Sequence, residues 1–230
     1  QAPPAYTSHA RIASLESQAL SESTPSVIVW FRQDLRLRDN PALSAAASED
    51  RPVIPLYIHD LDGHGEWSIG GAQRWWLHHS LNALSNAIDD IGSNLVIRSG
   101  SALDVLTQLI KQTGAASVYW NRRYEPAVID RDGEIKRELA ERQVEGRSFK
   151  AHLIWEPWEV ETKGGDPYKV FTPFWRNVQQ RPEPSTPLSA PTGLASPGRW
   201  PDGEALDELG LLPDIDWADG LEERWTPGEQ

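Results

Sequence analysis

Five short runs of apolar residues, several of them β-branched, recur along residues 26–154, and segments of helical periodicity separate them. Runs of about four to eight such residues are typical of strands that are buried on both faces. Strands that alternate with helices are joined by right-handed crossovers, so they lie parallel in one sheet with helices on both faces. The pattern therefore predicts an α/β fold: a doubly wound, Rossmann-like domain around a five-stranded parallel sheet.

The individual elements follow from the same periodicities. We expect strands at Val27–Phe31, Pro52–Ile58, Leu95–Ile97, Ala116–Trp120 and Ser148–Ile154. The helix between the second and third strands is the clearest, because its apolar residues are three or four positions apart and share one face: Leu77, Leu81, Leu84, Ile88 and Ile91. The remaining helices are expected at 41–48, where Asn40 and Pro41 form a helix start, at 102–112 and at 125–143.

The flanks of this domain lack its periodicity. Residues 1–25 are polar and form an N-terminal extension, although a short helix is conceivable over 11–20. Beyond the domain at 26–155, residues 156–230 are expected to be an irregular interdomain linker with one short helix at 172–180, capped by Thr172. Six prolines between Arg181 and Pro201 predict a stiff, extended connector outside the core. Thr226-Pro227 has the form of a further helix start.

Charge and composition exclude several classes of function. The net charge is −12, of which −9 lies in residues 200–230, and no segment forms a basic patch for DNA. Any DNA binding is therefore expected to come from residues outside this sequence. The acidic end is expected to be a solvated linker. There is no cysteine for a disulfide, a thiolate metal site or a nucleophile. No run is apolar enough for a membrane span and no secretory signal is present, so a soluble, cytoplasmic protein is expected.

The usual catalytic and phosphate-binding motifs are missing. No glycine follows the first strand as a dinucleotide fingerprint requires, and Gly65 and Gly70 have the P-loop spacing without its Lys and Ser/Thr. His78 and His79 are adjacent on a helix and cannot chelate one metal together. A loop with His59, Asp60, Asp62 and His64 could hold a metal, but a solvated loop is the more frequent outcome. No metal site and no catalytic residue is predicted, and the residues favour a domain that binds.

Two segments are richer in functional side chains than their positions require. Residues 30–40 place three Arg and two Asp directly after the first strand, where they form either a binding mouth or a network of salt bridges that ties the loop to the sheet. Residues 164–176 combine a turn, a helix start and many aromatic side chains, and this composition favours a surface that docks on another domain.

Four motifs in order identify a resemblance. They are WFRQDLRLRDNPAL at 30–43, RWWLHHSL at 74–81, VYWNRRYEP at 118–126 and YKVFTPFWR at 168–176. Together they resemble the photolyase/cryptochrome family, most closely the bacterial photolyases of cyclobutane pyrimidine dimers. The resemblance implies that this chain is the antenna (light-harvesting) domain of a DNA repair lyase. A helical domain outside these residues would bind FAD and damaged DNA, so this chain alone is expected to be inactive.

The resemblance also implies a pigment pocket at the ends of the first, second and fourth strands. Carried over position by position, the residues that line it are Arg32, Gln33, Ile58, Asp60, Asn121, Arg123 and Glu125. Such a set suits a planar polar heterocycle, which needs fixed donors and acceptors at the rim of an apolar slot. Family members that use a deazaflavin often have an acidic residue at the position of Arg123. Those that use a folate in the best-known manner have an Asn-Glu pair at the positions of Ala127 and Val128. The pocket could therefore hold a folate, a deazaflavin, FMN or no pigment.

Two other functions are compatible with these residues. The domain could be the sensory part of a cryptochrome, a blue-light photoreceptor without repair activity, since the distinguishing residues lie elsewhere. It could also be an unrelated nucleotide-binding α/β protein, such as an electron-transfer flavoprotein subunit or a stress protein, which the ordered motifs disfavour. In the antenna reading, we expect the segment Phe171–Trp175 and the mouth near Arg32 to be exposed, and the chain alone to retain pigment poorly.

Overall fold

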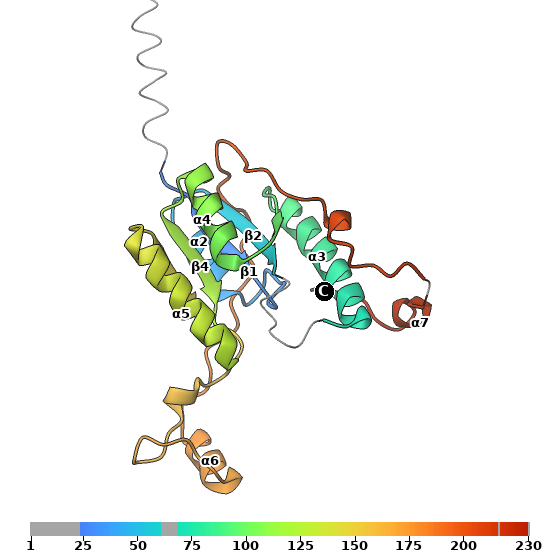
Figure 1. The fold of residues 1–230 in the computed structure, drawn as a ribbon. Helices are drawn as coiled ribbons and strands as arrows, with labels where there is room; N and C mark the ends of the chain where they lie inside the picture. The colour runs from blue at the N-terminus through green and yellow to red at the C-terminus, as the bar shows by residue number, and fades with distance from the viewer. Residues whose placement is uncertain (1–23, 61–68, 216, 230) are drawn as a thin grey trace, which may run out of the picture.

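The computed structural model describes residues 24–60, 69–215 and 217–229. Its centre is one five-stranded, all-parallel sheet in the order β3-β2-β1-β4-β5 (Figure 1). The strands are β1 (Val27–Phe31), β2 (Val53–His59), β3 (Val96–Ser99), β4 (Ser117–Asn121) and β5 (Glu145–Phe149). The order reverses between β1 and β4, so the prediction of a doubly wound parallel sheet is confirmed. In such a fold, ligands bind beyond the carboxyl ends of the strands at this reversal.

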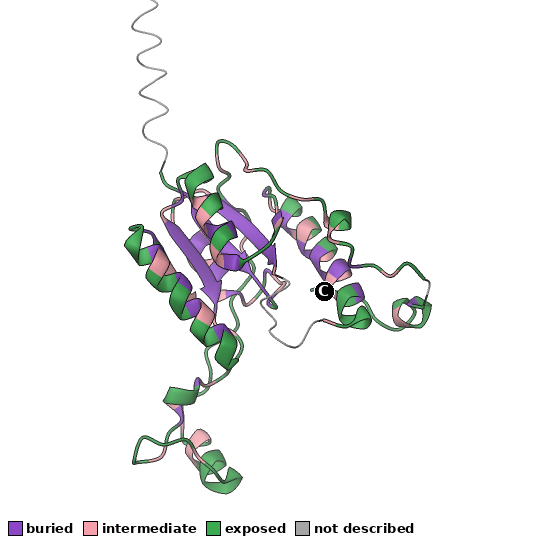
Figure 2. Ribbon diagram, in the orientation of Figure 1, coloured by how far each residue is buried: buried purple, intermediate pink, exposed green. Residues whose placement is uncertain are grey.

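Helices cover both faces of the sheet, as predicted. The covering helices are α2 (Pro41–Ala47), α3 (Gly71–Asp90), α4 (Ala102–Thr113) and α5 (Pro126–Glu141). Two shorter helices, α6 (Phe171–Val178) and α7 (Asp219–Glu222), lie outside these layers. Alternate residues of β1 enter two separate cores: Ile28 and Trp30 pack with α4 and α5, whereas Val29 and Phe31 pack with α2 and α3. Figure 2 shows the central strands buried between these layers. No helix in the described ranges is long and apolar enough to cross a membrane.

The fifth strand lies earlier than the sequence predicts. It runs from Glu145 to Phe149, whereas Leu153 and Ile154 of the predicted strand are exposed. As an edge strand it needs only one covered face, so its residues do not form an apolar run. At Gly146 the sheet approaches α5 closely: a Cβ there would lie 3.1 Å from Leu139 and 3.4 Å from Trp120. The expected strand was wrong because the edge position removes the apolar signal.

Two predicted helix starts also differ. Helix α6 begins at Phe171 after Val170, so Thr172 lies inside the first turn and is not the cap. No helix starts at Thr226; α7 lies just before it, and the chain then continues without regular structure to Glu229. The possible helix at 11–20 falls outside the described residues.

The proline-rich connector returns to the domain. Leu194 is buried against the core of α2 and α3, the carbonyl of Ala195 accepts a hydrogen bond from Val53, and Leu211 packs against Tyr57 and Leu81. The prediction that this stretch stays outside the core is therefore wrong. Part of the acidic end is likewise bound, because the Glu204 carboxylate accepts hydrogen bonds from the backbone N–H and hydroxyl of Ser99. By contrast, α6 stands apart from the sheet (Figure 1).

Candidate functional site

A cavity of about 490 Å³ opens beyond the carboxyl ends of β1 and β2 and is bounded on one side by α3. Apolar and aromatic side chains alternate in its wall with charged, amide and hydroxyl groups. Its lining includes Trp30, Arg32, Gln33, Leu35, Arg36, Tyr57, Ile58, Asp60, Ile69, Gln73, Trp76, Leu77, Ser80, Arg123, Arg131, Gly228 and Glu229. The volume suits one small organic ligand, and the mixture of apolar and fixed polar groups is that of a cofactor site.

One wall of this cavity is a pair of arginines, the buried Arg32 and the partly buried Arg131. Arg32 is 7% exposed and donates from Nη1 to both carboxylate oxygens of Asp132, at 3.0 and 2.8 Å, and from Nη2 to the carbonyl oxygen of Asn121. Arg131 donates to Asp132 at 3.2 Å and pairs with Asp60 at 3.5 Å. The two guanidinium carbons lie 5.0 and 5.2 Å from the centroid of the Trp30 ring. Asp132 therefore holds both cations against one aromatic side chain.

This wall retains unused donors. The Nε atoms of Arg32 and Arg131 are buried and have no hydrogen-bond partner within the described part of the chain. Burial lowers the pKa of Arg32, and Asp132 opposes that shift. Because both Nε atoms are closed to solvent, they do not face the cavity, and a ligand there would meet the partly exposed side of the Arg131 guanidinium group. The observation fits a heterocycle with a carbonyl or other acceptor edge.

Asn121 belongs to the interior of the protein. Its side chain donates to Asp34 at 2.5 Å and to Asn40 at 2.7 Å, and accepts from the backbone of Ala42 at 3.1 Å. These contacts join the end of β4 to the loop after β1 and to the start of α2. Asn121 is absent from the lining of the cavity, so the structure gives the predicted pigment contact a structural role instead.

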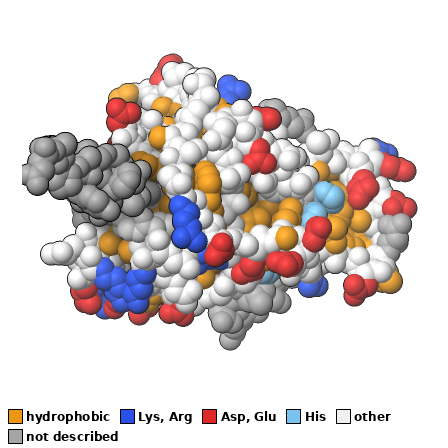
Figure 3. Space-filling model, turned by 90° about the horizontal axis from the view of Figure 1, so that it is seen from above, with side chains coloured by type: hydrophobic (Ala, Val, Ile, Leu, Met, Phe, Trp, Pro, Cys, Tyr) orange, Lys and Arg blue, Asp and Glu red, His pale blue; other side chains and the backbone are white. Residues whose placement is uncertain are grey.

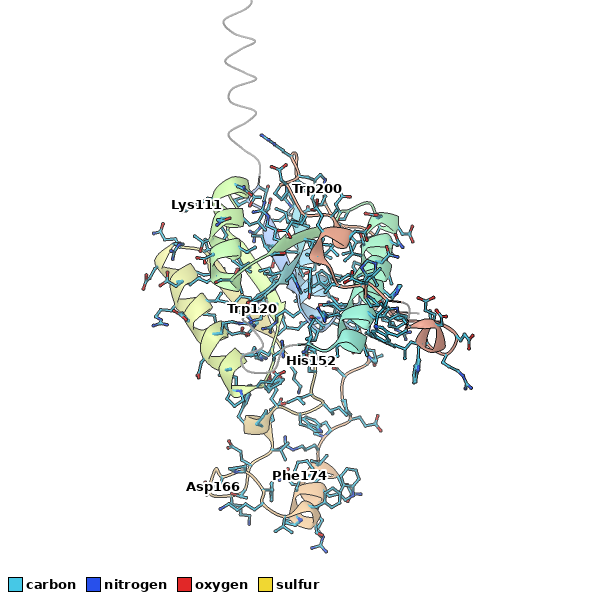
Figure 4. The ribbon with its side chains drawn as sticks, turned by 45° about the vertical axis from the view of Figure 1, so that its right-hand side comes forward. Lys111, Trp120, His152, Asp166, Phe174 and Trp200 are labelled. Carbon is cyan, nitrogen blue, oxygen red and sulfur yellow. The ribbon has the colours of Figure 1, made fainter. Side chains whose placement is uncertain are left out.

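The two remaining predicted residues lie at the rim. Arg123 lines the cavity and donates to Glu125 at 2.5 Å, and these hydrogen bonds from Arg123 lower the pKa of Glu125 to about 2. Glu125 borders a neighbouring, smaller cavity of about 310 Å³ with Gln33, Tyr124 and His152. His152 lies beyond the carboxyl ends of the strands in Figure 4, while Trp120 lies in the sheet. Ala127 and Val128 line neither cavity.

The structure thus brings five of the predicted residues to one cavity: Arg32, Gln33, Ile58, Asp60 and Arg123. The expectation of an exposed mouth is wrong for Arg32, because Asp132 makes its burial favourable, whereas Gln33 at the rim is exposed. Arg131, the α3 residues and Glu229 also line the cavity and were not among the predicted residues. Of these, only the contribution of α3 had a local signal in the sequence. The segment RWWLHHSL has more polar and aromatic residues than the packing of one helix face requires.

Other predicted features carry no site. His78 is buried in the packing of α3, and its pKa is lowered by burial and by the adjacent His79. Asp62, His64 and Gly65 lie outside the described residues, and the described ranges contain no cluster of ligands for a metal ion. On the face seen in Figure 3, Lys and Arg form separate groups among Asp and Glu, without one continuous basic patch.

Comparisons with known proteins agree with this architecture. A family model described as DNA photolyase matches residues 27–192. A deoxyribodipyrimidine photo-lyase of Agrobacterium fabrum is 46% identical over 211 residues, which cover 91% of this chain and 43% of that protein. Cryptochrome-2 of Arabidopsis thaliana is 34% identical over 209 residues, 87% of this chain and 34% of that protein.

A solved structure is similar as well. The crystal structure of a bacterial class III photolyase from Agrobacterium tumefaciens has a TM-score of 0.84 and 46% identity, and the match covers 90% of this chain and 42% of that one. The chain therefore spans less than half the length of these relatives. The chain belongs to the DNA photolyase family.

Proposed function

From this membership, we propose that the chain is the antenna domain of a deoxyribodipyrimidine photo-lyase, which splits cyclobutane pyrimidine dimers in damaged DNA. The observation that carries the proposal is the cavity at the carboxyl ends of β1 and β2, where Arg32 and Arg131 stand against the Trp30 ring. FAD and the DNA lesion would be bound by a helical domain in the part of the relatives that this chain does not span. A cytoplasmic location remains a prediction.

The cavity residues fit a light-harvesting chromophore. Such a pigment, when bound, would absorb light and pass the excitation energy to the flavin. Ile58 and Leu77 would exclude water from its faces, while the partly exposed guanidinium group of Arg131 would offer a charged donor to an acceptor edge. Because Asp132 fixes both guanidinium groups, the donors are in place before a ligand arrives. A folate, a deazaflavin and FMN all carry such an edge.

Substituting Arg131 tests the cavity directly. Arg131→Met keeps much of the side-chain volume but removes the donor, so we expect about tenfold weaker binding, the loss of roughly one hydrogen bond from a charged group. The measurement is a fluorescence titration of the chain with FMN, a reduced folate and a 5-deazaflavin. Arg137→Met, on the same helix and away from the lining, is the control and should bind like the wild type. Equal affinities for all three proteins would argue against the cavity as the pigment site.

The repair activity needs the protein in its full length. Purified full-length protein should remove pyrimidine dimers from ultraviolet-irradiated DNA under blue light and not in the dark. The greater identity to a photo-lyase than to cryptochrome-2 favours this outcome. A protein that binds FAD and responds to light but leaves the dimers intact would instead be a photoreceptor.

The proposed partner of α6 is the helical domain. Phe171 and Trp175 are 69% and 47% exposed, and their rings are stacked at 6.1 Å, with Phe174 beside them. Figure 4 shows Phe174 on this helix, well away from Trp120 and the sheet. A cluster of large exposed aromatic side chains is expected to be covered in the complete protein.

Replacing both Phe171 and Trp175 with Ser tests whether these side chains are exposed in this chain but covered in the full-length protein. In this chain, the free energy of unfolding should change by less than about 0.5 kcal/mol, because both side chains are exposed. In the full-length protein, the same change should increase proteolysis between the two domains. Destabilisation of the isolated chain by several times that amount would contradict the proposed docking surface.

A further inference from the structure

The last described residues of the chain return to the cavity that the first strand opens. The carboxylate of Glu229 accepts hydrogen bonds from the backbone N–H groups of Leu37, at 2.6 Å, and Arg38, at 2.9 Å. Glu229 and its neighbour Gly228 both line the cavity. Figure 1 shows the C-terminus between α3 and the carboxyl ends of the strands. A contact between residues 192 positions apart thus forms part of the proposed binding site.

The loop that receives Glu229 is suited to an anion. Leu37 and Arg38 offer two successive N–H groups, and Asp39 follows in the left-handed region at φ 49°. Successive N–H groups before such a residue form a concave binding site for anionic oxygens. The next N–H, of Asp39, donates to the carbonyl of Leu188. The same loop carries Arg32, Gln33, Leu35 and Arg36 of the cavity lining, so its position determines the shape of the cavity.

The other side of the contact is fastened to α3. We call residues 217–229 the closing segment. Its Trp225 ring packs edge-on against Trp76 at 6.2 Å, and a Cβ on Gly71 would lie 3.2 Å from the Trp217 ring. At Gly228, where φ is +102°, a Cβ would lie 2.5 Å from that of Ala83. The closing segment therefore lies tightly on α3 and reaches the loop after β1 through Glu229.

We propose that Glu229 is a positioning residue that fastens the closing segment to this loop and so completes the cavity around its ligand. The inference rests on the proposed function for the retention of a chromophore. It assigns Glu229 a role that does not require contact with the ligand, because both carboxylate oxygens are used by the loop. A competing arrangement is that the carboxylate occupies a place that an anionic group of the ligand needs, and the two predict opposite effects on affinity.

The test compares Glu229→Ala with Glu223→Ala, which removes an exposed carboxylate from the same segment. In the full chain without ligand, hydrogen exchange at the amides of Leu37 and Arg38 should become about tenfold faster in Glu229→Ala, because two charge-assisted hydrogen bonds are lost. FMN, used as the probe, should dissociate about tenfold faster from this variant. Glu229→Gln keeps one acceptor oxygen and should lie between. The thermal midpoint should change little, since Glu229 is exposed.

Four outcomes decide the matter. Unchanged exchange at Leu37 and Arg38 in Glu229→Ala would overturn the proposal, and so would unchanged or slower dissociation of FMN. Tighter binding of FMN would show that the carboxylate competes with the ligand. If FMN fails to bind the wild-type chain, the proposed function loses its support for this pigment, while the exchange measurement still decides whether Glu229 fastens the loop.

Discussion

Replacing Asp132 with Asn is expected to lower the free energy of unfolding by about 3–5 kcal/mol, the usual cost of breaking a buried ion pair from one side. The Asp132 carboxylate accepts hydrogen bonds from Arg32, from Arg131 and from the indole N–H of Trp120 at 3.1 Å. An amide keeps only one acceptor oxygen and turns an N–H₂ group toward these donors. The buried Arg32 guanidinium would then lose its ion-pair partner and keep only the Asn121 carbonyl and the charge of Asp34 to compensate it.

Urea denaturation of the two proteins measures this effect. Asp130→Asn, on the same helix but at an exposed position, is the control and should change the free energy by less than about 0.5 kcal/mol. A double variant, Arg32→Met with Asp132→Leu, should recover much of the loss, because it removes both charges together. A loss below about 1 kcal/mol for Asp132→Asn would show that water compensates Arg32, contrary to its burial.

Asn121→Leu should cost about 3 kcal/mol or more, since it removes three hydrogen bonds and leaves a buried carboxylate poorly satisfied. Asp34 is 2% exposed; one of its oxygens accepts from Asn121 and the other from the backbone of Arg32 at 2.8 Å. Leucine has a similar volume but offers neither donor nor acceptor. The loop after β1 and the start of α2 would both lose their link to β4.

The comparison of stability with ligand binding distinguishes a structural Asn121 from a pigment contact. Urea denaturation should show the loss, while Asn82→Leu on the exposed side of α3 should not. At a temperature where the variant is folded, its affinity for FMN should fall by no more than about tenfold, the effect expected from loosening the loop after β1 alone. A stable Asn121→Leu protein with much weaker FMN binding would restore the role that the family resemblance implied.

Much of the fold was predictable because its signals are local. The four-three spacing of apolar residues over 77–91 and the apolar runs of β1, β2 and β4 reflect burial on defined faces, and burial is confirmed for each run. The misplaced β5 shows the limit of this signal. An edge strand buries too little to demand apolar residues, so Glu145–Phe149 resembles a loop. The connector was misjudged because prolines exclude regular structure but not packing, as Leu194 shows.

The binding site was predictable only in part. Arg32, Gln33, Ile58, Asp60 and Arg123 follow strand ends, and parallel strands bring their carboxyl ends to one edge. The position of a strand end does not decide which way a side chain points, and Asn121 turned into the interior. Arg131 lies on a helix that covers the sheet, and Glu229 lies far along the chain, so neither carries a local signal of its role.

The sequence by itself thus determined the parallel sheet, its two helical layers and the edge of the sheet at which the cavity lies, because periodicity encodes which face of each element is buried. The tertiary structure decided how the charges of that edge are used. Asp132 lies 100 residues from Arg32, and Glu229 lies 192 residues from Leu37. These residues pair because packing brings their side chains together and because a buried charge or N–H group without a partner is unfavourable. A local sequence pattern contains no information on either.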